Sequence, residues 1–319
     1  MKRRKRRRRQ QKRKLSLILC AIILLITAAA FLLYTPELLH QSTDSLSLNA
    51  DNHDSNALDL TALNSSYAIL VKADTGDILA ERNSTEQLYP ASLTKIMTAL
   101  VAVENITDLD QWSQLPADIF PDLYEQNASM AGFQPGEEVT LRDLLYGILL
   151  PSGAECCLAI ADYIASSESA YVDMMNQKAS ELGMANTHFC NTTGLHDNSH
   201  YSTAEDLAVL VKYAVNNSQF REVFTSSSYT TSTSSLHPEG FTFYSRLFSS
   251  LDSPAVSNGE ILGGKTGYTQ EAQLCLASLA AVNGSEYILV TAYAEGSTQT
   301  EPFHVQDAVN VYNQIGSAY

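Results

Sequence analysis

The sequence predicts an α+β fold in which an antiparallel sheet is built from both ends of the folded part of the chain. Two hairpin patterns carry this prediction, one around residue 75 and one around residue 283, and helical periodicity fills most of the chain between them. The chain has 319 residues, of which 45% are hydrophobic and 17% charged, so a sizeable core can form. We therefore expect one domain with an inserted helical subdomain.

The strands are predicted from apolar runs that flank turn residues. In the first hairpin, residues 67–71 and 78–80 flank the turn sequence Asp-Thr-Gly-Asp at 74–77. In the second, residues 274–282 and 287–293 flank Asn283-Gly284, a pair typical of tight hairpin turns. A further strand is predicted at 260–262.

The helices are predicted from apolar residues that recur every three to four positions. The helix that begins near residue 203 also carries a predicted capping box, Ser202 with Glu205. The predicted helices cover residues 91–104, 141–150, 154–164, 170–182, 203–215 and 305–315.

The N-terminus has the pattern of a membrane anchor. Residues 1–14 hold 11 of the 20 Lys and Arg and no acidic residue, and residues 15–33 are uncharged and close to the length that spans a bilayer. Cationic flanks stay in the cytoplasm, so a basic tail (1–14), a transmembrane signal-anchor (15–33), a flexible extracytoplasmic stalk (34–64) and a folded domain (65–319) are predicted. The alternative is a signal peptide cleaved at the small residues 28–30, although the apolar run continues beyond them.

The charge and cysteine content exclude several other functions. Residues 15–319 hold 9 Lys and Arg against 35 Asp and Glu, a net charge of −26, which argues against nucleic-acid binding. Besides Cys20 in the apolar run, the cysteines are Cys156, Cys157, Cys190 and Cys275, and we expect small core residues in preference to a disulfide or redox pair. No His-Glu-x-x-His or paired Cys-x-x-Cys pattern predicts a metal, and His196 and His200 are expected to be loop polar residues.

Ser92 and Lys95 are the first candidate catalytic residues in the sequence. Pro90 suits a helix start, and residues three apart share one helix face. A lysine in a largely buried helix is costly unless it loses its proton or gains partners, and a neutral lysine beside a serine forms a nucleophile with its base. Taken alone, this pattern also fits a capping serine and a lysine that reaches solvent.

Two more motifs strengthen the catalytic interpretation. Ser152 lies in a predicted turn between two apolar helices, and Lys265-Thr266-Gly267 lies at the edge of the predicted C-terminal strands. In this order, the three motifs are similar to those of the serine penicillin-recognising enzymes. The segments YPASLTKIMTALVAVEN, LLPSGAE, NTTGLHDNSHYSTAEDLA and GGKTGYT resemble the low-molecular-weight penicillin-binding proteins, the S11-like serine-type D-Ala-D-Ala carboxypeptidases, and the resemblance extends from about Ser66 to the C-terminus.

The resemblance implies a fold and a set of partners. The family fold is β-lactamase/transpeptidase-like, an antiparallel five-stranded sheet flanked by helices, with a helical subdomain. The implied substrate is a peptidoglycan stem peptide ending in D-Ala-D-Ala, β-lactam antibiotics would acylate the same serine, and no cofactor is implied. With the predicted span, this places a single-pass protein in the cytoplasmic membrane, its catalytic domain on the outer side.

The resemblance also implies roles for individual residues. Ser92 would attack the carbonyl between the last two D-alanines, Lys95 would take its proton, and Ser152 would relay a proton to the leaving amine. Lys265 and Thr266 would hold the terminal carboxylate, which requires a cation and a hydroxyl. The backbone N–H groups of Ser92 and Tyr268 would form the oxyanion hole.

One departure from the family pattern leaves alternatives open. The second motif is usually Ser-x-Asn, but here it is Ser152-Gly153-Ala154, so an amide that contacts the substrate carbonyl and the catalytic lysine is missing. Glu155 lies one position away. A catalytically weak homologue that binds wall peptides or partner proteins is one alternative. A β-lactamase is another, although no Glu-x-x-x-Asn element that would supply a deacylating base lies between Ser152 and Lys265.

Overall fold

The computed structural model describes residues 58–317. The predicted basic tail, the predicted membrane span and most of the predicted stalk lie outside the described residues. Between residues 58 and 317, no helix is long and apolar enough to cross a membrane. The last residues of the predicted stalk differ from the expectation, because Leu60 and Leu63 are only 5% and 8% exposed and pack in an apolar cluster of the body. The packed body therefore already includes Leu60, which precedes the predicted start of the folded domain at residue 65.

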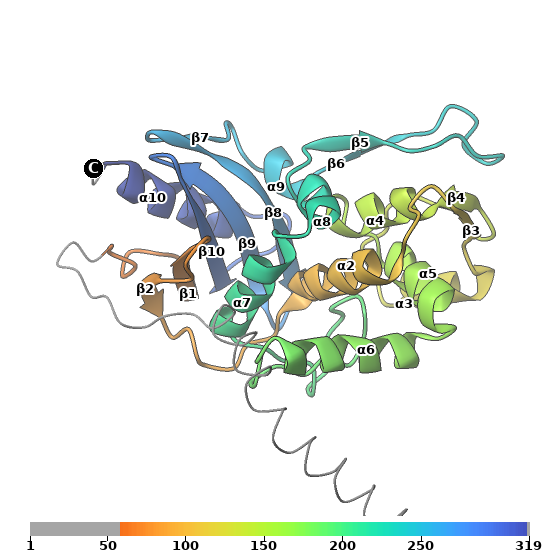
Figure 1. Cartoon of the computed structure of the whole chain (residues 1–319), viewed down its shortest axis with the longest axis horizontal. Coiled ribbons are helices and arrows are strands. Elements are labelled where there is room, and N and C mark those ends of the chain that lie inside the picture. The colour runs from red at the N-terminus through yellow and green to blue at the C-terminus, as the bar shows by residue number, and fades with distance from the viewer. Residues whose placement is uncertain (1–57, 318–319) are drawn as a thin grey trace, which may run out of the picture. The chain divides into compact units, whose positions relative to one another are not determined.

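A six-stranded antiparallel sheet forms the centre of the fold (Figure 1). Its order is β2-β1-β10-β9-β8-β7, so the N-terminal hairpin pairs with the C-terminal one, as the sequence predicts. Five strands were expected, and the sixth is a two-residue strand that pairs with the beginning of β8. The bounds are β1 Ser65–Lys72, β2 Ile78–Arg82, β7 Ala255–Val256, β8 Gly259–Thr269, β9 Gln273–Val282 and β10 Ser285–Ala294.

The two predicted hairpins are confirmed, and β8 is longer than predicted. Asn283 and Gly284 both have a positive φ, 51° and 75°, which suits the tight turn between β9 and β10. The prediction of a strand at 260–262 missed residues 263–269, because glycines and a lysine have low strand propensity. Pairing of Gly263 through Thr269 with β9 overrides that propensity.

Helices cover both faces of the sheet. On one face α10 (Phe303–Ser317) buries Val305 and Tyr312 in the cluster that also holds Leu60. On the other face α2 (Thr94–Asn105) and α7 (Ala204–Ala214) pack in the larger cluster. The remaining helices are η1 Ala91–Leu93, η2 Ala117–Ile119, α3 Phe120–Glu125, α4 Leu141–Leu149, α5 Ala154–Ala165, α6 Glu168–Glu181, α8 Ser218–Phe224 and α9 Arg246–Ser249.

The predicted helices are present, with one cap in a different place. Thr203, not Ser202, caps α7, because its side chain accepts a hydrogen bond from the Asp206 N–H. The Ser202 hydroxyl lies 2.8 Å from the Thr187 Oγ1 instead, and the Ser202 backbone exchanges hydrogen bonds with Leu88. Two small antiparallel sheets complete the helical part of the fold. One pairs β3 Trp112–Gln114 with β4 Glu138–Thr140, which η2 and α3 separate in the chain, and the other is the hairpin of β5 Ser228–Thr230 with β6 Thr242–Tyr244.

The cysteines within the described residues are all free. Cys156, Cys157 and Cys275 are buried, and Cys190 is partly buried. Burial raises the pKa of the Cys157 thiol to about 12, so it remains a protonated core residue.

Candidate active site

Ser92 and Lys95 lie one turn apart where η1 passes into α2. The Lys95 Nζ lies 3.2 Å from the Ser92 Oγ and donates a 2.6 Å hydrogen bond to the Thr193 carbonyl oxygen. Ala91, directly before Ser92, has a backbone φ of 46°, a conformation that residues other than glycine rarely adopt. The local backbone therefore turns sharply just before it presents the Ser92 hydroxyl.

The Lys95 amine lies in a site that favours its neutral form. Its side chain is almost fully buried, and this burial is the main cause that lowers its pKa below the usual value of 10.5. The Arg246 guanidinium lowers the pKa further, whereas Glu155 opposes the shift. A neutral amine within hydrogen-bond distance of a hydroxyl can accept its proton.

Ser152 and Lys265 form a second pair opposite the first. Ser152 has a φ of 72° in the turn between α4 and α5, and its Oγ accepts a 2.9 Å hydrogen bond from the Lys265 Nζ. Lys265 also donates to the Thr266 carbonyl oxygen at 2.7 Å. Burial, followed by the nearby Lys95 and Arg246, lowers the pKa of Lys265 well below its usual value.

The three motifs meet at one cavity of about 870 Å³. Of the predicted site residues, Ser92, Ser152, Thr266 and Tyr268 line this cavity. Both lysines lie behind the wall, 2% and 1% exposed, and contact the cavity through the two serines. Lys265 therefore supports Ser152 and donates to the backbone of Thr266, and its predicted contact with a ligand stays a prediction.

Gly267 allows β8 to approach the nucleophile. A Cβ at this position would lie 3.1 Å from the Ser92 backbone nitrogen and 3.3 Å from the Pro90 carbonyl oxygen. Both contacts are tighter than nearly all real Cβ contacts, so any larger residue would push the strand away from η1. The Ser92 N–H and the backbone of Tyr268 therefore lie along the same wall of the cavity.

Thr193 is a site residue that the sequence reasoning missed. The Asn191 Oδ1 accepts hydrogen bonds from the backbone N–H groups of Thr193 and Gly194, at 3.2 and 2.7 Å, which shapes this loop as an Asx turn. The turn aims the Thr193 carbonyl oxygen at the Lys95 Nζ. The Asn-x-x-Gly spacing at 191–194 was the available signal.

His200 fixes the same loop to α2. Its Nδ1 accepts a 3.1 Å hydrogen bond from the Cys190 N–H, so the proton of the neutral ring lies on Nε2, 2.8 Å from the Thr94 Oγ1. Burial lowers the pKa of His200 to about 4. His200 is therefore a buried structural link, and no group of three potential metal ligands occurs among residues 58–317.

Arg246 gives the cavity a positive charge. It is the sole Asp, Glu, Lys or Arg among the described residues that line the cavity, in a protein whose body carries a large excess of acid. Its backbone N–H donates to the Leu150 carbonyl oxygen at 3.2 Å, which fixes α9 beside the Ser152 turn. A lining with this charge attracts an anionic ligand.

Glu155 does not take the place of the amide that is missing at Ala154. Its Oε1 accepts hydrogen bonds from the N–H groups of Ala131 and Gly132, at 2.7 and 2.9 Å, and its side chain does not line the cavity. Burial raises the pKa of this carboxyl group. Asn127 and Ser129 line the cavity instead, and Ser129 accepts a 2.8 Å hydrogen bond from the Ala154 N–H.

Solved structures of DD-peptidases share the fold. The Streptomyces K15 DD-transpeptidase superposes with a TM-score of 0.70 and 29% identity, over 81% of this chain and 98% of that one. A D-alanyl-D-alanine carboxypeptidase from Mycobacterium tuberculosis H37Rv superposes with a TM-score of 0.72 and 25% identity, over 84% of this chain and 97% of that one. The transpeptidase/β-lactamase fold expected from the resemblance is thereby confirmed.

Sequence comparison gives the same result. The D-alanyl-D-alanine carboxypeptidase DacF of Bacillus subtilis (strain 168) is 44% identical over 149 residues, 46% of this chain and 37% of the relative. The D-alanyl-D-alanine carboxypeptidase of Streptomyces sp. (strain K15) is 30% identical over 246 residues, 75% of this chain and 82% of the relative. The match with DacF thus spans little more than a third of that protein's length. Residues 51–296 match the D-alanyl-D-alanine carboxypeptidase family, to which this chain belongs.

Proposed function

We propose that this protein is a serine-type D-Ala-D-Ala carboxypeptidase that removes the terminal D-alanine from peptidoglycan stem pentapeptides. One observation carries the proposal: the Lys95 Nζ lies 3.2 Å from the Ser92 Oγ, with Ser152 and Thr266 lining the same cavity. A nucleophile with its base, opposite a second hydroxyl and a cationic wall, suits attack on a peptide bond next to a free carboxylate.

The proposed reaction begins with acylation. The Ser92 Oγ attacks the carbonyl carbon between the two D-alanines while its proton passes to the Lys95 Nζ. The backbone N–H groups of Ser92 and Tyr268 stabilise the oxyanion. The proton that Lys95 accepted then passes through the Ser152 hydroxyl to the departing amine, which returns Lys95 to its neutral form. The Ser152 Oγ accepts a hydrogen bond from Lys265. The terminal D-alanine then leaves, and Ser92 holds the remaining peptide as an ester.

Deacylation completes the cycle. Lys95 takes a proton from water, the resulting hydroxide attacks the ester carbonyl, and the Ser92 Oγ recovers its proton as the shortened peptide leaves. A β-lactam would form the same kind of ester with Ser92.

The substrate carboxylate is assigned to Thr266 and Arg246. Both line the cavity, and an arginine with a hydroxyl is a suitable donor set for a carboxylate. Lys265, buried behind them, adds to the positive potential and orients Ser152. We assign to Asn127 the amide role that Ala154 lacks, because Asn127 lines the cavity together with Ser152, and the Ser129 carbonyl oxygen two positions later accepts a hydrogen bond from the Ala154 N–H.

Proteins of this family act in the cell envelope. For this chain we propose the more specific arrangement in which residues 15–33 anchor it in the cytoplasmic membrane and the folded body lies outside the cytoplasm. The uncharged run of 19 residues after a strongly basic segment supports this orientation.

The proposed activity is tested by incubation with a pentapeptide muropeptide, followed by mass analysis of the products. Loss of one alanine, together with a fluorescent penicillin adduct that is absent from a Ser92→Ala variant, is the expected result. A folded protein that forms no Ser92-dependent adduct and releases no alanine would instead be a wall-peptide binder. Rapid turnover of penicillin without a lasting adduct would indicate a β-lactamase.

A further inference from the structure

We propose that a second cavity, next to Trp112 and away from Ser92, binds the sugar chain of the cell wall. The inferred ligand is a β-linked chain of uncharged N-acetylated amino sugars. The identification of the source rests on the proposed function, because the stem peptide is attached to such a chain. The cavity itself is inferred from residues that the proposed reaction does not use.

Trp112 provides a stacking surface on a fixed part of the fold. It is the only tryptophan in the chain, and it is 54% exposed, which is unusual for the largest apolar side chain. Trp112 pairs with Thr140 in the β3–β4 sheet, and the neighbouring Gln111 accepts a hydrogen bond from the Tyr163 hydroxyl. An exposed indole held on a strand offers a flat face for the C–H side of a sugar ring.

Polar groups surround this indole face. The cavity has a volume of about 450 Å³ and is lined by Trp112, Glu138, Thr233, Ser234, Ser235 and Pro238. The side-chain hydroxyls of Thr233 and Ser235 and the Glu138 carboxylate make no hydrogen bond to any of residues 58–317. These free donors and acceptors match sugar hydroxyl and N-acetyl groups.

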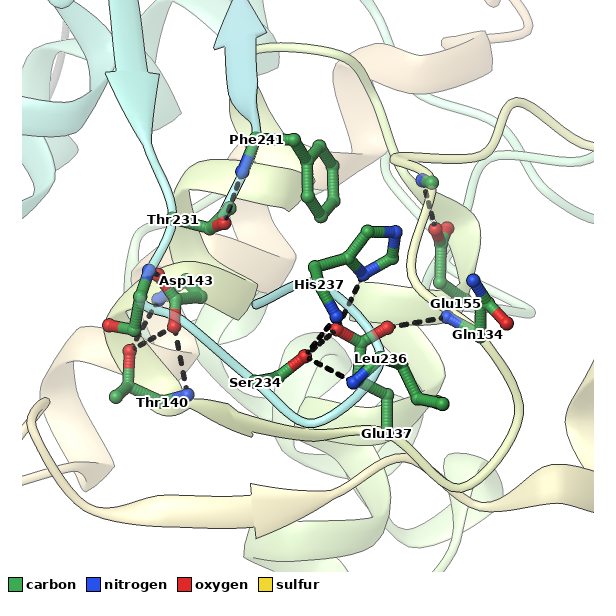
Figure 2. A network of polar contacts seen from close by, with 12 residues as sticks. Gln134, Glu137, Thr140, Asp143, Glu155, Thr231, Ser234, Leu236, His237 and Phe241 are labelled. Atoms are coloured by element: carbon green, nitrogen blue, oxygen red, sulfur yellow. Dashed lines mark hydrogen bonds and ion pairs between the residues drawn. The ribbon is translucent and has the colours of Figure 1, made fainter. Parts of the chain in front are cut away.

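A buried network holds the opposite wall in place (Figure 2). The Ser234 Oγ donates a 2.6 Å hydrogen bond to the Glu137 Oε1 and accepts one from the His237 N–H at 2.9 Å. The His237 Nδ1 lies 2.7 Å from the same carboxylate oxygen, and Glu137 is only 1% exposed. Thr233 and Ser235, on either side of Ser234, are therefore positioned before any ligand arrives, which lowers the entropic cost of binding.

The charge of the site favours an uncharged ligand. Glu138 is the only charged residue among the described residues that line this cavity, and the body of the protein carries a large negative charge. Both repel polyanions such as nucleic acids. Aromatic and proline side chains also occur in grooves for proline-rich peptides, but the three hydroxyl residues in the lining favour a sugar.

The β5–β6 hairpin connects this cavity with the one that contains Ser92. Figure 1 shows the hairpin reaching from α9 over α4 toward β3 and β4. Ser235 lines the Trp112 cavity and Arg246, eleven residues later, lines the other, so the connecting chain spans at most about 40 Å. One sugar chain bound at Trp112 would thus keep its attached stem peptides close to Ser92.

The experiment uses the single tryptophan as its reporter. Titration with N-acetylglucosamine tetramer, whose sugars carry no charge, is followed by intrinsic tryptophan fluorescence and by calorimetry. We expect a saturable fluorescence change, together with an affinity that falls at least tenfold in Trp112→Ala and severalfold in Ser235→Ala. The matched control is Tyr244→Ala, since Tyr244 is 64% exposed and does not line the cavity.

The outcomes separate this proposal from the proposed function. An unchanged tryptophan signal, equal affinity of Trp112→Ala and the parent protein, or saturable binding of a proline-rich peptide without sugar binding would overturn the proposal. Penicillin labelling of Ser92 in Trp112→Ala shows that this variant is folded. Sugar binding without any Ser92-dependent adduct would contradict only the proposed function.

Discussion

Two regions of this protein bury ionisable groups, and they do so in opposite ways. Beneath the β5–β6 hairpin, the Asp143 carboxylate accepts four hydrogen bonds, from the Thr140 N–H and hydroxyl, the Tyr229 hydroxyl and the Ser232 N–H. Figure 2 shows Asp143 and Thr140 within this network. Beside the large cavity, Lys95 and Lys265 each have two hydrogen-bond partners, one of them a serine hydroxyl.

The difference separates a structural site from a reactive one. A buried charge whose lone pairs are all satisfied stabilises a fold and is costly to remove. Burial of an amine with few partners lowers its pKa, so the neutral form is favoured and can accept a proton from a neighbouring hydroxyl. Substitutions in the two regions should therefore affect different measured quantities.

The largest expected effect is on catalysis, from Lys95→Met. We expect acylation by penicillin to slow by about 10³-fold, because the general base is lost. The free energy of unfolding at pH 7 should not fall, since an apolar side chain of similar length suits a buried site. Stopped-flow labelling and urea denaturation measure the two quantities.

The control for this variant is Lys212→Met. Lys212 is also buried, with a pKa lowered by burial, but it lies on α7 and its Nζ donates a 3.3 Å hydrogen bond to the Thr75 carbonyl oxygen, whereas the Lys95 Nζ contacts Ser92. Equal slowing of acylation in both lysine variants would contradict the assignment of Lys95 as the base.

The second effect is on stability, from Asp143→Ala. Removal of this carboxylate leaves several buried donors without an acceptor, so we expect a loss of about 3 kcal/mol in the free energy of unfolding. In Asp110→Ala, which breaks only the exposed 2.9 Å ion pair with Arg142, the loss should be below about 1 kcal/mol. Similar losses in the two variants would show that the network is not a structural anchor.

A third effect is a loss of stability in mild acid, caused by His200. Its folded pKa is about 4 and its unfolded pKa is near 6.5, so the unfolded chain binds more protons between these values. Stability is therefore highest above pH 6.5 and falls by up to about 3 kcal/mol as the pH drops to 4.

Denaturation of the parent protein and a His200→Gln variant across this pH range isolates the contribution of His200. This comparison is needed because burial also lowers the pKa of His304 to about 4. We expect a smaller decrease in the variant, and parallel curves for the two proteins would contradict the assignment.

The smallest expected effect comes from Asn127→Gly. This change removes the side-chain amide while it suits the left-handed backbone, whose φ is 49°. Acylation should slow by about tenfold, the value of one hydrogen bond to the substrate. Asn83→Gly, at an exposed position with a φ of 50°, should leave the rate unchanged. An unchanged rate in Asn127→Gly would show that Asn127 does not take the role of the amide that is missing at Ala154.

Much of the sheet and the proximity of Ser92 to Lys95 could be predicted from the sequence because local patterns determine them. Asn283-Gly284 fixes a hairpin turn, and the spacing of Ser92 and Lys95 places both on one helical turn. The resemblance to a known family predicted that Ser152 and Lys265 lie at the same site.

The remaining features depend on contacts between distant segments, which no local pattern contains. The Thr193 carbonyl reaches Lys95 across 98 positions of the chain, and Glu155 turns toward the backbone of Ala131 instead of the cavity. The full length of β8 similarly depends on its pairing with β9. Burial of Lys265 behind Ser152 likewise depends on contact between β8 and the turn that joins α4 to α5, which are far apart in the sequence.

The pH dependence of the acylation rate tests the central claim most directly, that a neutral Lys95 activates Ser92. Because the pKa of Lys95 is lowered, the parent protein should show a rate that rises with pH through an apparent pKa below 10.5 and falls in acid as the amine gains a proton. In Lys95→Met this dependence should disappear from the residual rate. The same rising limb in both proteins, or no rising limb in the parent protein, would contradict the account.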